Sequence, residues 1–345
     1  MPRALILGGS GAVGRALAMR LLQEGWEVDL TGRNPGRFDT TVAALGARYI
    51  QSDRRESSEL VSVFGGGADL LVDCVCYTAA EARQLVTLAK TAGSTVMISS
   101  KALYVDDQGK HSNSPGGPSF VGPIQESQPT MAPSDVDFNS AEGYGANKVA
   151  AELVLLESGL PISIVRPSKI HGVGAQNPRE WFFVKRILDR RPTELLANAD
   201  IAESPTASVN LAEIILVAAA HPDQRILNAA DPDAPDIRTM AGVVANHMDY
   251  EWNEVLLPPD APESLGRTPW DKPSPVILDI TAALALGYEP IGDYASTVGD
   301  EIDWLVDIAI RTNGIHLPDV INNQYLERLF DYKAEDAFLA ARDRF

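Results

Sequence analysis

Tyr144 and Lys148 are the two side chains of this sequence whose spacing best suits proton transfer. Residues four positions apart lie on one face of a helix, so the phenol and the ammonium would project side by side. An ammonium close to a phenol stabilises the phenolate, which suits the tyrosine to act as a general acid and base. This spacing is also common on ordinary helix surfaces, so it indicates proton transfer only if the pair faces a binding site.

A glycine-rich segment near the N-terminus predicts such a site. Gly8, Gly11 and Gly14 stand three residues apart, after an apolar run and at the start of a helical pattern. Glycines there permit a tight turn and let backbone N–H groups approach a pyrophosphate, which the helix dipole also attracts. We expect a dinucleotide here, and a turn without a ligand is the alternative. The predicted contacts are Gly8, Ser10, Gly11, Ala12, Val13 and Gly14.

The second apolar run bears on the type of dinucleotide. Asp29 follows Gly8 at about the distance expected of an acidic residue that binds the ribose of NAD, but it falls in mid-strand. The run ends at Gly32 and Arg33, and an arginine there can bind the 2′-phosphate of NADP. NADP(H) is therefore favoured over NAD(H), with an Arg33 that meets only solvent as the alternative. Asp53 is expected near the adenine or as a cap of its own loop.

The N-terminal half has the pattern of a scaffold that would position these residues. Short apolar runs alternate with helical patterns, as in an α/β fold with a Rossmann-type doubly wound parallel sheet. Ligands in such sheets bind beyond the carboxyl ends of strands, so Ser99 and Ser100, at the end of the fifth run, should lie near Tyr144. Strands are predicted at 4–7, 28–31, 48–50, 70–75, 95–99 and 162–165, and helices at 12–23, 79–91 and 141–157.

The C-terminal half is less regular. We expect a Rossmann domain over residues 1–170 and a mainly substrate-binding lobe over 171–345, with a segment around 206–235 returning to the first domain. The Pro-, Ser- and Gly-rich stretch 106–137 predicts a long loop beside the site. The tail 313–345 is partly amphipathic, through Tyr325, Leu326, Leu329 and Phe330, and should dock on the body or on a second subunit.

Composition and net charge restrict the classes of partner that the chain is expected to bind. The chain has 345 residues, 45% of them hydrophobic, and its 29 Lys and Arg against 47 Asp and Glu give a net charge of −18. That charge argues against nucleic acid and an anionic membrane surface, and leaves a small molecule as the expected partner. No export signal or membrane-spanning run stands out, which predicts a cytoplasmic protein. Cys74 and Cys76 are expected to be buried on one side of a strand, and no metal site is predicted.

Together these residues resemble the extended short-chain dehydrogenase/reductases, the NAD(P)-dependent epimerase/dehydratase family. The resemblance implies that Tyr144 is the general acid/base, that Lys148 holds the nicotinamide ribose, and that Ser100, with Ser99 as the fallback, binds the reacting oxygen. It also implies a cofactor contact at Ser168, a second lobe that closes over the substrate, and a homodimer. The matching motifs are Gly8/Gly11/Gly14, Ser99-Ser100 with Tyr104, Tyr144 with Lys148, and Arg166-Pro167.

Departures from the family pattern bear on the substrate. Lys169 stands where sugar-nucleotide enzymes often have asparagine, and it would bind an anionic group or only solvent. Tyr104 and His171 are further substrate candidates, with a hydrogen-bonded structural histidine as the favoured alternative for His171. Lys101-Ala102 replaces the Asp-Glu pair typical of dehydratases, which disfavours dehydration.

The sequence thus predicts an NADP(H)-dependent oxidoreductase or epimerase that acts on a carbonyl or carbinol carbon of a small polar substrate, with a nucleotide sugar as one candidate. The alternative is a catalytically silent NADP-binding sensor or scaffold of the same fold.

Overall fold

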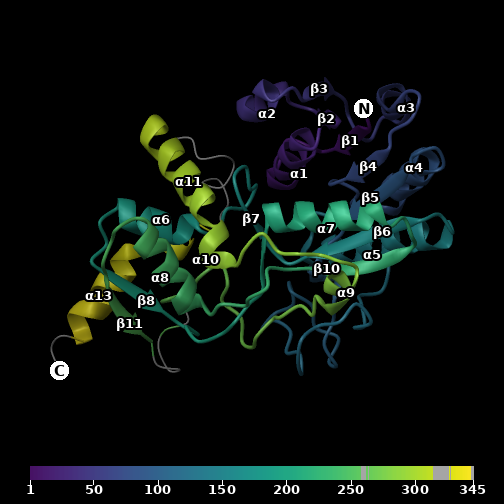
Figure 1. Ribbon diagram of the computed structural model, residues 1–345. Helices are drawn as coiled ribbons and strands as arrows, with labels where there is room; N and C mark the ends of the chain where they lie inside the picture. The colour runs from purple at the N-terminus through teal and green to yellow at the C-terminus, as the bar shows by residue number, and fades with distance from the viewer. Residues whose placement is uncertain (258–261, 263, 314–325, 327, 343–345) are drawn as a thin grey trace.

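A parallel sheet of seven strands, in the order β10-β6-β5-β4-β1-β2-β3, forms the centre of the computed structural model (Figure 1). The structure describes residues 1–345 except 258–261, 263, 314–325, 327 and 343–345. The predicted α/β class with a Rossmann-type sheet is confirmed. The strands are β1 (Arg3–Leu7), β2 (Glu27–Gly32), β3 (Arg48–Gln51), β4 (Leu70–Asp73), β5 (Ser94–Ile98), β6 (Ile162–Pro167) and β10 (Arg225–Ala229).

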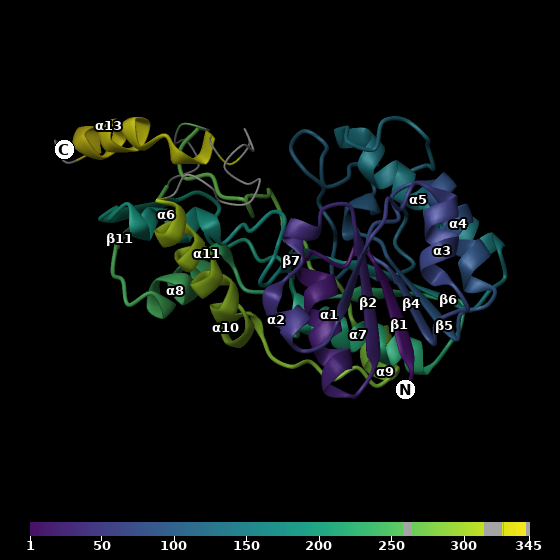
Figure 2. The ribbon, with the colours of Figure 1, turned by 90° about the horizontal axis from the view of Figure 1, so that it is seen from above.

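Both faces of the sheet are buried, which explains why its strands are continuous apolar runs. Ala4 and Ile6 of β1 face one core cluster, and Leu5 and Leu7 face the other, because successive side chains of a strand alternate. Helices cover the two faces from opposite sides (Figure 2). One face carries α1 (Ala12–Gln23), α2 (Thr40–Ala44), α7 (Ser208–Ala220) and α9 (Thr281–Ala285), and the other α3 (Ser57–Phe64), α4 (Ala79–Ala89) and α5 (Ala141–Glu157).

The strand order reverses at β1, which pairs with β2 on one side and with β4 on the other. At such a switch point, the connections after neighbouring strands leave in opposite directions and a crevice opens at the carboxyl ends. The glycine-rich turn after β1 and the segment after β4 therefore border the same crevice.

A second lobe lies beside the sheet (Figures 1 and 2). Trp181, Phe182 and Phe183 are buried in its hydrophobic core rather than exposed to a ligand. The pair β7 (Lys169–His171) and β9 (Pro205–Ala207) lies where the chain leaves β6 for this lobe. The lobe contains α6 (Trp181–Leu188), β8 (Thr193–Leu196), α8 (Ile237–His247), β11 (Asn253–Leu256), α10 (Tyr294–Thr297), α11 (Gly299–Thr312) and α13 (Tyr332–Arg342).

The C-terminal tail docks on this lobe. Arg186 of α6, which is 1% exposed, binds both carboxylate oxygens of Glu335 in α13 at 2.6 and 3.0 Å. Leu326 is buried in the same core, and Leu329 and Phe330 pack against it, whereas Tyr325 lies outside the described residues. None of the described helices is long and apolar enough to cross a membrane.

The prediction that the two cysteines share one side of a strand is wrong, whereas the predicted burial holds for Cys76 and in part for Cys74. β4 ends at Asp73, whose carboxylate accepts a hydrogen bond from the N–H of Val75 at 3.0 Å and turns the chain out of the sheet. Cys74 then packs against the core on the α1 side, and Cys76 lies in the core on the α4 side. Burial raises the pKa of the Cys74 thiol to about 12, so this side chain is a poor nucleophile at neutral pH.

A buried polar cluster joins the three elements that carry the expected active site. Glu152 of α5 accepts hydrogen bonds from Arg166 of β6 at 2.5 and 3.0 Å and from the hydroxyl of Ser99, just past β5, at 2.5 Å. All three residues are less than 5% exposed. Because Glu152 stands four residues after Lys148, the cluster also fixes the rotation of α5 about its axis.

Replacing Glu152 by alanine should lower the free energy of unfolding by about 3–5 kcal/mol, because Arg166 would remain buried without its counter-charge. Glu157→Ala, at the exposed end of the same helix, should change it by no more than about 0.5 kcal/mol. Urea unfolding measures both. Equal effects of the two substitutions would mean that the cluster does not hold the three elements together.

Candidate active site

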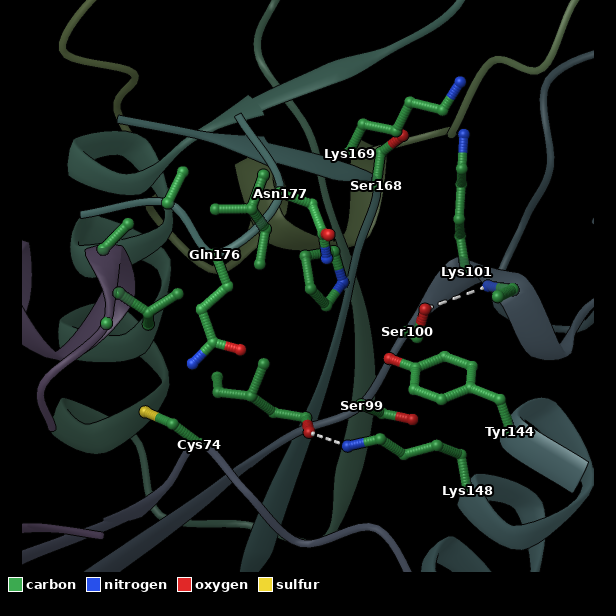
Figure 3. A pocket seen from close by; sticks show the side chains of 18 of the residues that line it. Cys74, Ser99, Ser100, Lys101, Tyr144, Lys148, Ser168, Lys169, Gln176 and Asn177 are labelled. Atoms are coloured by element: carbon green, nitrogen blue, oxygen red, sulfur yellow. Dashed lines mark hydrogen bonds between the residues drawn. The ribbon is translucent and has the colours of Figure 1, made fainter. Parts of the chain in front are cut away.

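A pocket opens at the carboxyl ends of the central strands and continues toward the second lobe (Figure 3). Its wall begins at the glycine-rich turn and continues past the ends of β4 and β5 to α5. Ser112 and Asn113, from the long loop 106–137, and Lys272 also line it. The pocket thus joins the predicted dinucleotide turn to the predicted proton-transfer pair.

The glycine-rich turn has the shape that a pyrophosphate needs. Gly8 has φ +74°, a conformation that favours glycine, and a Cβ on Gly14 would lie 2.4 Å from the Cα of Gly9. Gly11 faces the open pocket: a Cβ there would meet no atom closer than Gln176 Nε2 at 3.9 Å. No side chain caps the N-terminus of α1 and its first turn has no acidic residue, so its N–H groups remain available to an anion.

Of the residues predicted at this turn, Gly8, Gly11, Ala12, Val13 and Gly14 line the pocket, and Ser10 does not.

Lys148 is almost fully buried beneath the pocket, at 2% exposure. Its ammonium donates to the carbonyl oxygens of Ile98 at 2.8 Å and Cys76 at 2.9 Å, and lies 4.6 Å from the centre of the Tyr77 ring. An ammonium has three N–H donors. The two carbonyls use two of them, which leaves one for a further acceptor such as a ribose hydroxyl.

Tyr144 and Ser100 point toward each other across the pocket wall (Figure 3). Ser100 Oγ accepts the N–H of Ala102 at 3.1 Å, so its own proton is free to be donated. Gly145 permits this approach, because a Cβ there would lie 3.1 Å from the carbonyl oxygen of Ala102. The fallback, Ser99, lines the pocket but gives its proton to Glu152, so the structure favours Ser100.

The residues predicted to bind the adenosine end of the cofactor do not line the pocket. Asp29 is 1% exposed and bound to Arg3 at 2.8 Å and Arg48 at 2.7 Å; burial opposes its ionisation, but these arginines hold its pKa below the usual range. It is therefore not free to bind a ribose. Arg33, just past β2, is exposed, and its guanidinium makes no hydrogen bond or ion pair within the described part of the chain, whereas its carbonyl accepts from Gln51 at 3.2 Å. Asp53 accepts the N–H of Arg55 at 3.0 Å and so caps its own loop.

The structure does not bring Tyr104 or His171 into this pocket. Tyr104 is 1% exposed and donates to Asn228 at 2.7 Å, inside the core. His171 is 2% exposed and hydrogen-bonds Asp231 at 2.9 Å. Ser168 does line the pocket, although its hydroxyl donates to the carbonyl of Ser204. Buried partners, which sequence spacing does not reveal, hold all three side chains.

Lys169 does lie in the pocket, together with a second lysine. Lys169 donates to Glu203 at 2.5 Å, and Lys101 donates to the other oxygen of the same carboxylate. Burial opposes the ionisation of Glu203, but the two ammonium groups lower its pKa to about 2. Burial lowers the pKa of Lys169 to about 7; Glu203 opposes this shift, while Lys101 and Arg179 add to it.

A comparison with protein families decides the family of this chain. The model of the NAD dependent epimerase/dehydratase family matches residues 4–230. The chain belongs to this family. A nicotinamide dinucleotide is therefore its cofactor class, and the fit of the glycine-rich turn to a pyrophosphate agrees with this.

Relatives and solved structures are similar at low sequence identity. An uncharacterized protein of Sinorhizobium fredii, y4nG, is 23% identical over 302 residues, which cover 85% of this chain and 69% of that protein. WbmH of Bordetella bronchiseptica, solved with NAD+, has a TM-score of 0.67 at 16% identity and covers 91% of this chain and 100% of its own. A UDP-N-acetylglucosamine 4-epimerase from Bacillus cereus has a TM-score of 0.66 at 17% identity and covers 88% and 98%. These structures share the fold of the epimerase/dehydratase family.

Sequence reasoning missed several residues of this pocket, among them Tyr77 and Glu203. Tyr77, whose ring centre lies 6.3 Å from that of Tyr144, follows β4 without a spacing that would mark it. Glu203 lies 102 positions from Lys101 and 34 from Lys169, so no local pattern joins them. The sequence singled out Lys101 only because it stands where dehydratases have an acidic residue.

Competitive labelling with acetic anhydride over a range of pH should show the Lys169 amine titrating at about 7. In Glu203→Gln the pKa should fall further, because the carboxylate that favours the charged amine is removed. Mass spectrometry of the labelled peptide gives the titration. A Lys169 amine that stays protonated to about pH 9, or that titrates identically in both proteins, would contradict the described electrostatics.

Proposed function

We propose that this chain is an NADP(H)-dependent oxidoreductase or epimerase that acts on a carbonyl or carbinol carbon of a small polar substrate. One observation carries the proposal: the Tyr144 hydroxyl, the Ser100 hydroxyl and the Lys148 ammonium meet in the pocket that begins at the glycine-rich turn. These are the groups that hold and move a proton where a hydride is transferred.

Each of these residues has a distinct part in the proposed reaction. A bound nicotinamide would supply the hydride acceptor in one direction and the hydride donor in the other. In the oxidative direction, Tyr144 as phenolate takes the proton of the substrate hydroxyl while the carbon loses its hydrogen as hydride, so that C–O becomes C=O. Ser100 donates a hydrogen bond to the same oxygen. The reverse reaction returns the proton from Tyr144.

Lys148 would act on both partners of this reaction. Its ammonium is held by two carbonyls below the pocket and has one N–H left, which we assign to a ribose hydroxyl of the cofactor. Its positive charge, one helical turn from Tyr144, stabilises the phenolate that the oxidative direction requires.

The preference for NADP rests on Arg33. Its exposed guanidinium follows the carboxyl end of β2 and is free of partners among the described residues, whereas the competing Asp29 is bound by two arginines. A guanidinium can bind the 2′-phosphate in a bidentate way, while a carboxylate there would repel it.

Replacing Tyr144 by phenylalanine should lower kcat by about 10²- to 10⁴-fold, because the proton is left without an acceptor. The matched control is Tyr77→Phe, which removes the same hydroxyl from a ring 6.3 Å away in the same pocket and should keep kcat within about threefold. Nicotinamide absorbance with a panel of ketones and nucleotide sugars measures turnover. Wild-type turnover in Tyr144→Phe would disprove the proposed role.

Arg33→Ala should raise the Kd of NADP+ by about 10- to 100-fold and change that of NAD+ by less than about twofold, because only NADP+ has the phosphate that the guanidinium binds. Arg83→Ala, on an exposed position of α4, should change neither. Isothermal titration of both dinucleotides checks this. Equal weakening of both cofactors by Arg33→Ala would rule out Arg33 as the determinant.

A further inference from the structure

The lobe end of the pocket holds an unusual concentration of positive charge. Lys101, Lys169, Arg179 and Lys272 line it, and Glu203 is the one carboxylate among the residues that the structure places in this wall. The chain as a whole has a net charge of −18, so this excess of cations is local. Pocket walls that focus one sign of charge attract a ligand of the opposite sign.

The two lysines nearest Glu203 have hydrogen-bond donors to spare. Lys169 gives one N–H to Glu203 at 2.5 Å and one to the carbonyl of Pro269 at 2.9 Å, and Lys101 gives one to Glu203. In the protonated form of both amines, this leaves one donor on Lys169 and two on Lys101 without an acceptor among the described residues. Their side chains are only 12% and 8% exposed. Buried ammonium donors without partners are costly, and an oxyanion would supply the missing acceptors.

Glu203 holds the two ammonium groups together before any ligand arrives. With its carboxylate between them, their mutual repulsion is offset and both stay at the pocket wall. Neutralising a single buried carboxylate would require one lysine, so the second lysine and Arg179 are in excess of that structural need. The guanidinium of Arg179 makes no hydrogen bond or ion pair to the described residues, and its forked donors match a carboxylate or phosphate.

This charge lies close to the proposed reaction centre. Lys101 is the next residue after Ser100, and Lys169 the next after Ser168 (Figure 3). In the close-up, both amines lie beyond Ser100, on the side away from Gln176 and the glycine-rich turn. A group bound to them would therefore lie on the Ser100 side of the pocket, away from the glycine-rich turn.

We propose that Lys101, Lys169 and Arg179 form an oxyanion site that binds an acidic group of the substrate next to its reacting carbon. This inference rests on the proposed function and narrows the substrate class to hydroxy or oxo acids, acidic sugars included. The acidic group is a carboxylate or a phosphate, which present the same oxygen acceptors to these donors. Lys272, whose ammonium donates to the carbonyl of Ser112 at 3.0 Å, adds charge at the rim.

Binding of matched acidic and neutral probes tests the site directly. Isothermal titration of the full chain, with and without saturating NADP+, would compare D-glucuronate with D-glucose, D-glucose 6-phosphate with D-glucose, and UDP-glucuronic acid with UDP-glucose. At least one acidic probe should bind about tenfold or more tightly than its neutral counterpart, and the pair that does so distinguishes a carboxylate from a phosphate. The proposal is overturned when no acidic probe binds more tightly than its neutral counterpart, complete absence of binding included.

Substitutions test which residues cause the preference for acidic over neutral probes. Lys169→Met and Lys101→Met should each reduce the acidic-to-neutral affinity ratio about tenfold while leaving the affinity for NADPH unchanged. Lys185→Met is the control, because Lys185 of α6 pairs with Asp189, just past the helix and outside the pocket, and should leave the ratio intact. An affinity ratio that survives both pocket substitutions would place the anion elsewhere. Since the wild-type comparison uses no variant, a variant that fails to fold does not remove the test.

The binding and turnover results together distinguish a failure of the oxyanion site from a failure of the proposed reaction. Acidic discrimination without turnover would leave the oxyanion site standing and refute the proposed reaction. Tyr144-dependent turnover of neutral substrates only would support the proposed reaction and refute the oxyanion site.

Discussion

The buried ammonium of Lys148 is the interaction on which the candidate site depends. Two carbonyls, one at the end of β5 and one just past β4, fix it under the pocket. A buried cation is tolerated only where such acceptors surround it, so the position of α5 is tied to these two strand ends. Tyr144, one turn earlier in the helix, is thereby held at the pocket wall.

The elements around the ammonium reinforce this arrangement. The Glu152–Arg166–Ser99 cluster fixes the same helix four residues further on, and Gly145 lets it approach the segment after β5. On the other side of the switch point, the glycine-rich turn keeps the N-terminus of α1 open. A dinucleotide anchored at that turn would extend toward Lys148. The same fold therefore positions both the cofactor and the pair proposed to transfer the proton.

Sequence patterns correctly predicted the features of the fold that depend on residues close together in the chain. Alternating strands and helices, the glycine-rich turn and the spacing of Tyr144 and Lys148 depend on neighbouring residues, and the Rossmann-type fold is confirmed. The prediction that the two cysteines share one side of a strand failed because β4 ends at Asp73, before either cysteine. Glu203 was missed because it lies 102 positions from Lys101 and 34 from Lys169, which it contacts only in the folded chain. Hydrogen bonds to distant partners likewise turn Tyr104 and His171 away from the pocket.

A crystal structure of the chain with bound NADP+ tests the role of Lys148 most directly. We expect Lys148 to keep its two carbonyl contacts, to give its remaining N–H to a hydroxyl of the nicotinamide ribose, and to leave the Tyr144 hydroxyl facing the nicotinamide ring. A nicotinamide bound away from Lys148, or a Tyr144 hydroxyl turned out of the pocket, would contradict it.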